Sequence, residues 1–288
     1  MVVAPEKISS GTSVLFIVAT PIGNLEDITV RAINTLQFVN LIACEDTRTS
    51  RILLNRYDIS TPLMSLHRFN ENRKIQTIVE RLETGQSVAL ISDAGTPNIS
   101  DPGYRLVRSV MEAGFRVVPI PGPSSVVAAL SVSGIDGSSF VFLGFSPKKA
   151  SALNDFFGHI SHEEKTIVFL ETARRIVKTM DVARKAIPSR RMVLCRELTK
   201  KFEEILCGNP ESLYDKLDQR ENIKGEFVVV IEPDGHRPAV DPDGVIEELI
   251  QEGLSGKNLA AEAHRRFGIS RTLAYRKFLS MAIKDDSD

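Results

Sequence analysis

The sequence predicts an α/β protein that consists of two α/β domains and a small C-terminal helical unit. Short apolar, β-branched runs, typical of buried parallel strands, alternate with amphipathic helical segments through the first half. Three of these runs end in loops rich in glycine and proline, where backbone amides can approach a ligand closely. A basic helical stretch follows a segment rich in proline, glycine and aspartate, which indicates a separate C-terminal unit.

Residues 14–136 are expected to form the first α/β domain. Strands are expected at 14–18, 41–44, 63–66, 88–91 and 117–120. Helices are expected at 28–39, 50–57, 70–84, 104–113 and 125–133. Helices between strands imply a mainly parallel sheet covered on both faces. Ligands of such sheets bind at the carboxyl ends of the strands, where the three loops Thr20–Asn24, Asp93–Pro97 and Pro121–Ser125 lie.

Residues 137–232 are expected to form a second α/β domain. Strands are expected at 140–144, 166–170, 192–195, 204–206 and 226–231, and helices at 173–186 and 211–219. This less regular order favours a mixed sheet over a purely parallel one. The polar residues 1–13 are expected to be a flexible N-terminus, and residues 233–244 to be a linker.

Residues 245–288 are expected to form a basic helical unit, with helices at 245–251, 258–267 and 271–282. The turn Gly268–Ser270, with Ser270 as N-cap, gives the last two helices a helix-turn-helix pattern. Between Lys257 and Lys284 there are seven Lys and Arg residues against one acid, Glu262, a local net charge of +6. These cations could simply form a solvated helical face, but the surplus of positive charge favours contact with phosphates.

Composition excludes several classes of function. The 288 residues carry a net charge of −1, so the chain as a whole is not a basic nucleic-acid binder. No apolar run approaches the roughly 20 residues that span a bilayer, and residues 1–13 lack the apolar core of a signal peptide. The three cysteines, Cys44, Cys195 and Cys207, are too few and dispersed for a disulfide framework or a zinc site. We expect a cytoplasmic protein without a membrane segment or a metal site.

The sequences of the loops also limit the classes of ligand that could bind there. They lack the G-x-G-x-x-G spacing of a dinucleotide site, and no G-x-x-x-x-G-K-[ST] phosphate loop occurs, so NAD and ATP are poor candidates. Asp93, at a strand end beside Gly95, suits a hydroxyl pair, an amine or a sulfonium, with a turn cap as an equal alternative.

Further charged residues lie at other predicted strand ends. Glu45–Arg48 would face the same crevice as Asp93, although adjacent opposite charges usually form a surface pair of little consequence. His67 and Asn70 follow the next strand, and a lone histidine is more often structural than catalytic. Arg196–Lys201 and Lys224–Glu226 place charge beside strands of the second domain.

Five motifs follow one another at familiar spacings. They are Ala19–Ile28, Glu45–Arg48, Ser92–Pro97 with Asp101–Gly103, Pro121–Pro123, and Arg196–Lys200. From about Val14 to Ala282 the chain closely resembles the ribosomal RNA small subunit methyltransferase I family, ribose 2′-O-methyltransferases of the tetrapyrrole methylase superfamily. Two positions depart from that family: Thr49 stands where histidine is common, and Ala150–Ala152 interrupts a basic run after Lys148 and Lys149.

The resemblance implies S-adenosylmethionine as the methyl donor, bound in a cleft between the two α/β domains of a homodimer. It implies a cytidine in the decoding centre of 16S rRNA as the target. On the first domain, the donor-binding residues would be Pro21, Gly23, Asp93, Ala94, Gly95, Thr96, Ser124 and Ser125. The second domain would contribute Leu170, Leu198, Gly225 and Glu226.

A ribose hydroxyl must lose its proton as it attacks the methyl group, which requires a base or a nearby cation. The candidates for these catalytic roles are Glu45, Asp46, Arg48, Glu197 and Lys200, and the sequence does not choose among them. One alternative is a C-methyltransferase of a corrin precursor, against which stand the first loop and the basic C-terminal helices. The other is a ligand-sensing DNA-binding regulator, against which stands the charge around the crevice.

Overall fold

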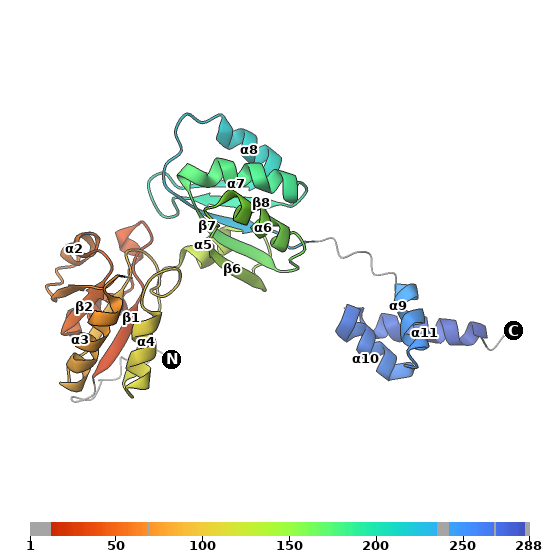
Figure 1. The fold of residues 1–288 in the computed structure, drawn as a ribbon, viewed down its shortest axis with the longest axis horizontal. Coiled ribbons are helices and arrows are strands. Elements are labelled where there is room, and N and C mark those ends of the chain that lie inside the picture. The colour runs from red at the N-terminus through yellow and green to blue at the C-terminus, as the bar shows by residue number, and fades with distance from the viewer. Residues whose placement is uncertain (1–12, 68, 235–241, 268, 286–288) are drawn as a thin grey trace. The chain divides into compact units, whose positions relative to one another are not determined.

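The computed structural model describes residues 13–67, 69–234, 242–267 and 269–285. The chain divides into two compact units, one up to Pro233 and one from Asp234 onward (Figure 1). No helix within the described ranges is long and apolar enough to cross a membrane. The expected flexible N-terminus and the expected linker lie largely outside the described residues. They stay predictions, as do the domain boundaries.

The first sheet is parallel throughout and has the order β3-β2-β4-β1-β5. Its strands are β1 (Val14–Val18), β2 (Leu41–Cys44), β3 (Leu63–Ser65), β4 (Val88–Ile91) and β5 (Arg116–Ile120). Its helices are α1 (Val30–Phe38), α2 (Thr47–Arg56), α3 (Glu71–Glu83) and α4 (Tyr104–Glu112), with a short 3-10 helix, η1 (Leu25–Asp27). The expected parallel sheet is confirmed.

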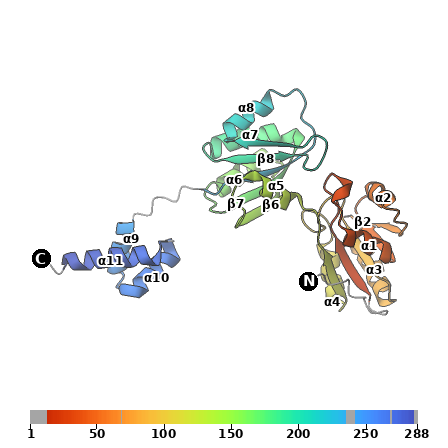
Figure 2. The same cartoon turned by 180° about the vertical axis from the view of Figure 1, so that it is seen from behind.

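Side chains that alternate along β1 explain why helices cover both faces of this sheet (Figures 1 and 2). Val14, Phe16 and Val18 pack in one apolar cluster with residues of α1 and α2. Leu15 points into a second cluster, with residues of α3 and α4. The helix expected at 50–57 begins earlier, at Thr47, because Asp46 accepts a hydrogen bond from the Arg48 amide and caps it.

The second sheet is mixed, as expected, and has the order β6-β7-β10-β8-β9. Its strands are β6 (Phe140–Phe145), β7 (Thr166–Thr172), β8 (Met192–Arg196), β9 (Glu204–Gly208) and β10 (Glu226–Ile231). Only the β6–β7 pair among these strands is parallel, and the other three pairs are antiparallel.

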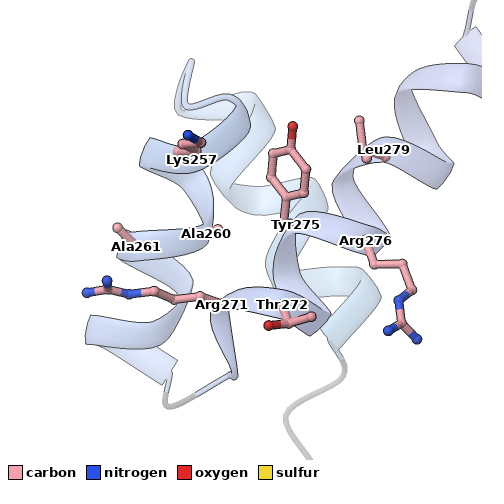
Figure 3. Close-up of a pocket in the computed structure, with 8 residues that line it drawn as sticks. All are labelled: Lys257, Ala260, Ala261, Arg271, Thr272, Tyr275, Arg276 and Leu279. Carbon is pink, nitrogen blue, oxygen red and sulfur yellow. The ribbon is translucent and has the colours of Figure 1, made fainter.

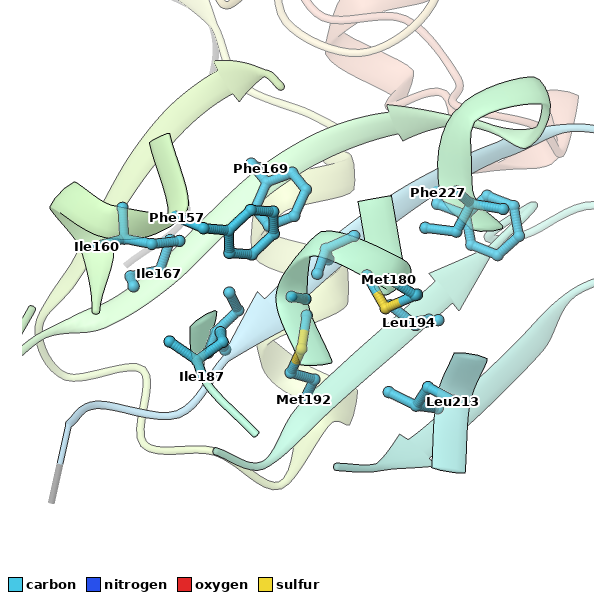
Figure 4. Packing of buried hydrophobic residues seen from close by; sticks show 14 of the residues in the cluster. Phe157, Ile160, Ile167, Phe169, Met180, Ile187, Met192, Leu194, Leu213 and Phe227 are labelled. Atoms are coloured by element: carbon cyan, nitrogen blue, oxygen red, sulfur yellow. The ribbon is translucent and has the colours of Figure 1, made fainter. Parts of the chain in front are cut away.

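One face of the second sheet is covered by α6 (Ala150–Ile160), α7 (Ala173–Ala186) and α8 (Pro210–Asp218). Phe157 and Phe169 lie edge to face in this core, to which Met180 and Phe227 also belong (Figure 4). The sequence analysis did not predict α6. Its buried residues Leu153, Phe157 and Ile160 have the helical spacing that would have revealed it.

The helix α5 (Ser125–Ser133) follows β5 of the first sheet in the chain but packs on the second sheet. Val126 and Ala129 lie in one buried cluster with Val193 of β8 and Val228 of β10. The segment therefore links the two sheets of the first unit physically, and it starts directly after one of the glycine and proline loops.

The second unit consists of α9 (Pro242–Gln251), α10 (Gly256–Phe267) and α11 (Arg271–Asp285). Ile246, Leu249, Leu259 and Ala274 are among the residues that form its own small core. The predicted helix-turn-helix is present as α10 and α11. The first helix begins at Pro242, three residues earlier than expected.

Candidate active site

An open pocket of about 520 Å³ lies where β2, β3 and β4 end. Its lining among the described residues is Glu45, Asp46, Thr47, Arg48, Ser65, His67, Phe69 and Asp93. The three strands are neighbours in a parallel sheet, so their carboxyl ends deliver these side chains to one edge. The volume is within the range of small-molecule sites. Four residues that the sequence singled out, Glu45, Asp46, Arg48 and Asp93, therefore meet here.

Asp46 is held by the first turn of α2. Its Oδ1 accepts hydrogen bonds from the Arg48 amide at 2.8 Å and from Arg48 Nε at 3.1 Å, and its Oδ2 accepts from the Arg48 guanidinium at 2.7 Å. These bonds lower the pKa of Asp46 to about 2. A carboxylate of such low basicity is a poor proton acceptor, so Asp46 serves to position Arg48. The Arg48 side chain itself is 89% exposed and free to meet a ligand.

Asp93 differs from Asp46 in its environment. Loss of hydration among the surrounding loops raises the pKa of Asp93, and the negative charge of Asp46 adds to this, while a hydrogen bond from the Asp46 amide opposes it. That amide donates to Asp93 Oδ1 at 3.1 Å. No donor in the described part of the chain hydrogen-bonds to Asp93 Oδ2. A partly desolvated carboxylate with an open oxygen in a pocket is suited to a cationic group.

The three glycine and proline loops are joined by hydrogen bonds. Thr20 and Gly95 exchange backbone bonds of 2.9 and 3.0 Å, and Thr96 Oγ1 donates to the Pro123 carbonyl at 3.3 Å. Gly95 has φ +79°, a conformation that favours glycine. Ser124 caps α5, which Ser125 opens. The residues predicted to hold the donor from the first domain thus form one continuous framework beside Asp93.

The loop that follows β8 contacts the first of these loops. The amide of Asn24 donates to Thr199 Oγ1 at 3.0 Å. A Cβ at Gly23 would lie 2.4 Å from Lys200 Cγ and 2.8 Å from the Leu198 carbonyl, so only glycine permits this approach. Ile22, Leu198 and Leu170 contribute to the same apolar cluster. Residues expected from the second domain therefore lie against a loop of the first.

Glu197 and Lys200 form an ion pair of 2.8 Å in that loop. Glu197 Oε1 also accepts from the Glu226 amide at 3.1 Å. Partial burial alone would raise the pKa of Glu197, but these two hydrogen bonds outweigh it and lower the pKa. Gly225 has φ +97°, and a Cβ there would lie 2.4 Å from Glu197 Cγ. This pair does not line the strand-end pocket as the described residues define it.

The sequence analysis left four of the lining residues, Thr47, Ser65, His67 and Phe69, out of its site. The His67 amide donates to Asn70 Oδ1 at 2.9 Å, which fixes the turn after β3. The Phe69 side chain is 98% exposed, and its ring stands edge-on to the His67 ring, 6.0 Å away. Their position in the sequence could have revealed His67 and Phe69, because both follow β3, which lies beside β2. Within the described ranges, no group of acidic, cysteine or histidine residues is arranged to hold a metal ion.

The fold is a parallel α/β domain whose strand-end loops contact a second, mixed α/β domain. The profile of the family described as Tetrapyrrole (Corrin/Porphyrin) Methylases matches residues 14–214, which span both domains. The relative named "Ribosomal RNA small subunit methyltransferase I" in Pasteurella multocida (strain Pm70) is 43% identical, over 92% of this chain and 96% of that one. The relative of the same name in Mesorhizobium japonicum is 41% identical over 95% and 93%. The chain belongs to the tetrapyrrole methylases and, within them, to the ribosomal RNA small subunit methyltransferase I family, which confirms the resemblance inferred from its motifs. It is therefore a methyltransferase that uses a methyl donor.

Solved structures support the same fold at lower sequence identity. Diphthine synthase superimposes with a TM-score of 0.60 at 14% identity, over 76% of this chain and 90% of that one. Uroporphyrin-III-C-methyltransferase from Thermus thermophilus gives 0.53 at 17%, over 76% and 94%. At such identities the likeness concerns the fold alone.

Proposed function

We propose that this protein transfers a methyl group from S-adenosylmethionine to the 2′ hydroxyl of a cytidine in the decoding centre of 16S rRNA. The observation that carries the proposal is the 43% identity, over nine-tenths of the chain, to relatives named for the small-subunit rRNA. The acidic pocket and the three joined loops supply a place for the chemistry. In this proposal the protein acts in the cytoplasm, where its substrate is assembled.

The pocket and loops fit S-adenosylmethionine, which carries a sulfonium, an amine and a nucleoside. Asp93 offers a partly desolvated carboxylate oxygen to a cation, and Gly95 allows close approach of the backbone. With Pro21, Gly23, Ala94, Thr96, Ser124 and Ser125, these residues would hold the donor from the first domain. Leu170, Leu198, Gly225 and Glu226 would do so from the second. When bound, the donor supplies a methyl group activated by the positive sulfur.

The chain's own residues would then align the acceptor and stabilise the charge that develops on it. Alignment of two reactants in an in-line displacement supplies much of the rate enhancement. Arg48, held by Asp46 yet exposed, is placed to stabilise an oxygen that becomes negative. Glu45, in the same pocket, is our candidate for the base. Glu197 and Lys200 neutralise each other and are better suited to shaping the site than to proton transfer.

Phe69 gives the pocket a feature suited to a nucleotide. A base in folded RNA must leave its stack to reach a pocket, and enzymes hold such a base against aromatic rings. Phe69 is 98% exposed at the pocket rim, and its ring contacts the edge of the His67 ring while leaving most of its surface open. In our proposal it stacks on the target base or on its neighbour.

The homodimer remains a proposal, supported by exposed apolar side chains on β6. This strand is at an edge of the second sheet and carries three exposed apolar side chains, Phe140, Leu143 and Phe145. Exposed edge strands with apolar side chains are normally covered. We propose a second copy as the cover. Light scattering should give twice the chain mass, and a Phe145→Glu variant should shift toward the monomer. A monomeric wild-type protein would contradict this.

Transfer of labelled methyl groups separates the candidate functions. The protein is incubated with labelled S-adenosylmethionine and with 30S subunits from cells that lack this enzyme, or with a corrin precursor. Subunits from cells that contain the enzyme, already methylated, are the control. Label on the ribose of a 16S cytidine only in the first sample supports the proposal. Label on the corrin precursor, or on neither substrate, would refute it.

A further inference from the structure

The six Lys and Arg residues between Lys257 and Lys277 fall into two groups. Those of the first group are paired with acids of the same unit. Arg265 and Arg266 both contact Glu262, and Arg266 also contacts Glu252 at 2.9 Å. Lys277 Nζ lies 2.6 Å from Asp243 Oδ1. These pairs neutralise part of the local charge, so the sequence count of +6 overstates what this part of the surface offers to an anion.

The second group consists of Lys257, Arg271 and Arg276. None of the three forms an ion pair with an acid in the part of the unit that the structure describes, and all three side chains are exposed. All three line the same open hollow, of about 540 Å³, between α10 and α11 (Figure 3). Among the cations of residues 257–277, those without an ion pair therefore lie around one hollow.

The same hollow carries an aromatic ring. In Figure 3 the Tyr275 ring stands up from α11, with Arg271 extending to one side of it and Arg276 to the other. Ala260 and Ala261 of α10 form a low wall opposite, which leaves the ring accessible. Tyr275 is 39% exposed. Arg271 and Thr272 open α11, so the positive end of the helix dipole adds to the field of the cations.

We propose that the hollow lined by Lys257, Arg271, Tyr275 and Arg276 binds an unpaired RNA strand, with phosphates on the three cations and a base stacked on Tyr275. Positively charged grooves with aromatic platforms are how proteins hold single strands, whereas bases in a duplex are already stacked. The choice of RNA rests on the function proposed above. The paired cations Arg265, Arg266 and Lys277 take no part.

Two double variants of the full-length protein with the same loss of charge test this. Arg271→Gln with Arg276→Gln removes two unpaired cations. Arg265→Gln with Lys277→Gln removes two paired ones and leaves Arg266 on Glu262. The probe is a fluorescent, unmethylated 16S rRNA fragment that spans the decoding centre, titrated between about 50 and 200 mM KCl. Circular dichroism checks that each variant is folded.

We expect the first double variant to bind more weakly and to flatten the log–log salt dependence by about 1.4 to 1.8, which is two phosphate contacts. The matched variant should keep the wild-type slope. Tyr275→Ala should weaken binding about 5- to 150-fold without changing the slope, and Tyr275→Phe should bind like the wild type. Equal effects of the two double variants, or a wild-type affinity of the first, would overturn the proposal. So would equal competition by duplex DNA.

Methyl transfer to 30S subunits by the wild-type protein is measured in parallel. If the wild-type protein transfers methyl groups but the two double variants bind RNA equally in the titration, the proposed surface is refuted and the proposed function stands. Absence of transfer refutes the proposed function, while the titration still decides whether the surface binds RNA.

Discussion

Replacement of Asp93 by asparagine removes one negative charge from the strand-end pocket and retains a side-chain oxygen for the Asp46 amide, which lies 3.1 Å away. If this carboxylate binds the donor, the variant must bind S-adenosylmethionine more weakly. A carboxylate and a cation about 4 Å apart attract each other by about 4 kcal/mol at an effective dielectric of about 20. Exposed pairs contribute about 1 kcal/mol or less. Asp93 is partly desolvated but open to water, so we expect about 1 to 2 kcal/mol, which weakens binding about 5- to 30-fold.

Calorimetric titration with S-adenosylmethionine measures this directly. Glu83→Gln, which removes an exposed acid at the end of α3, is the matched control and should bind like the wild type. S-adenosylhomocysteine lacks the sulfonium charge. An effect of Asp93→Asn on the donor alone therefore assigns Asp93 to the sulfur, and an equal effect on both ligands assigns it to the amine. An unchanged dissociation constant for both ligands would refute the role of Asp93.

The pH dependence of donor binding provides an independent check of the same residue. Desolvation raises the pKa of Asp93 above 3.8. Its charged form binds the cation, so donor affinity should fall as the pH is lowered, starting at a higher pH than for an ordinary aspartate. Asp93→Asn should lack this part of the pH dependence. An identical pH profile for the variant and the wild type would contradict the assignment.

Three further outcomes are expected. Arg48→Ala should slow methyl transfer at saturating RNA about 10-fold or more, with the donor dissociation constant near wild type; an unchanged rate would make Glu45–Arg48 a structural segment. Removal of residues 242–288 should leave the melting temperature of the α/β unit and its donor affinity unchanged, because the unit up to Pro233 is compact by itself. It should weaken RNA binding and reduce its salt dependence, and unchanged RNA affinity of the folded protein would refute this. Gly225→Ala should lower the free energy of unfolding in urea by about 1 to 3 kcal/mol, because φ is +97° and the new Cβ would meet Glu197; a wild-type midpoint would contradict it.

The sequence predicted the first sheet well because each buried strand is a short apolar run followed by a loop. The same reasoning failed at α6, where Ala150–Ala152 drew attention as a departure from a basic run and the apolar spacing of Leu153, Phe157 and Ile160 went unused. The sheet on which α5 packs could not be predicted from the sequence, for a different reason. Its apolar residues lie on all sides, which predicts burial but not which of two sheets the helix covers.

The strand-end pocket was partly predictable. The sequence identified Glu45, Asp46, Arg48 and Asp93 by their positions after strands. It could not show that β3 lies beside β2, which brings His67 and Phe69 to the same edge, because strand order depends on long-range packing. Nor could it assign different roles to Asp46 and Asp93, since the pKa of one is lowered by a guanidinium and that of the other is raised by desolvation.

The local charges of the two units argue for a division of labour in RNA binding. Among the described residues, the pocket lining holds three carboxylates, those of Glu45, Asp46 and Asp93, against one guanidinium. Such a surface favours a cationic donor and repels phosphates. At physiological salt, charges act over only about 8 Å, so these local balances matter more than the net charge of −1. Attraction of the RNA phosphates must therefore come mainly from surfaces outside the pocket, and the unpaired cations between α10 and α11 form one such surface. It follows that added salt should raise the KM for RNA while the affinity for the donor stays nearly constant.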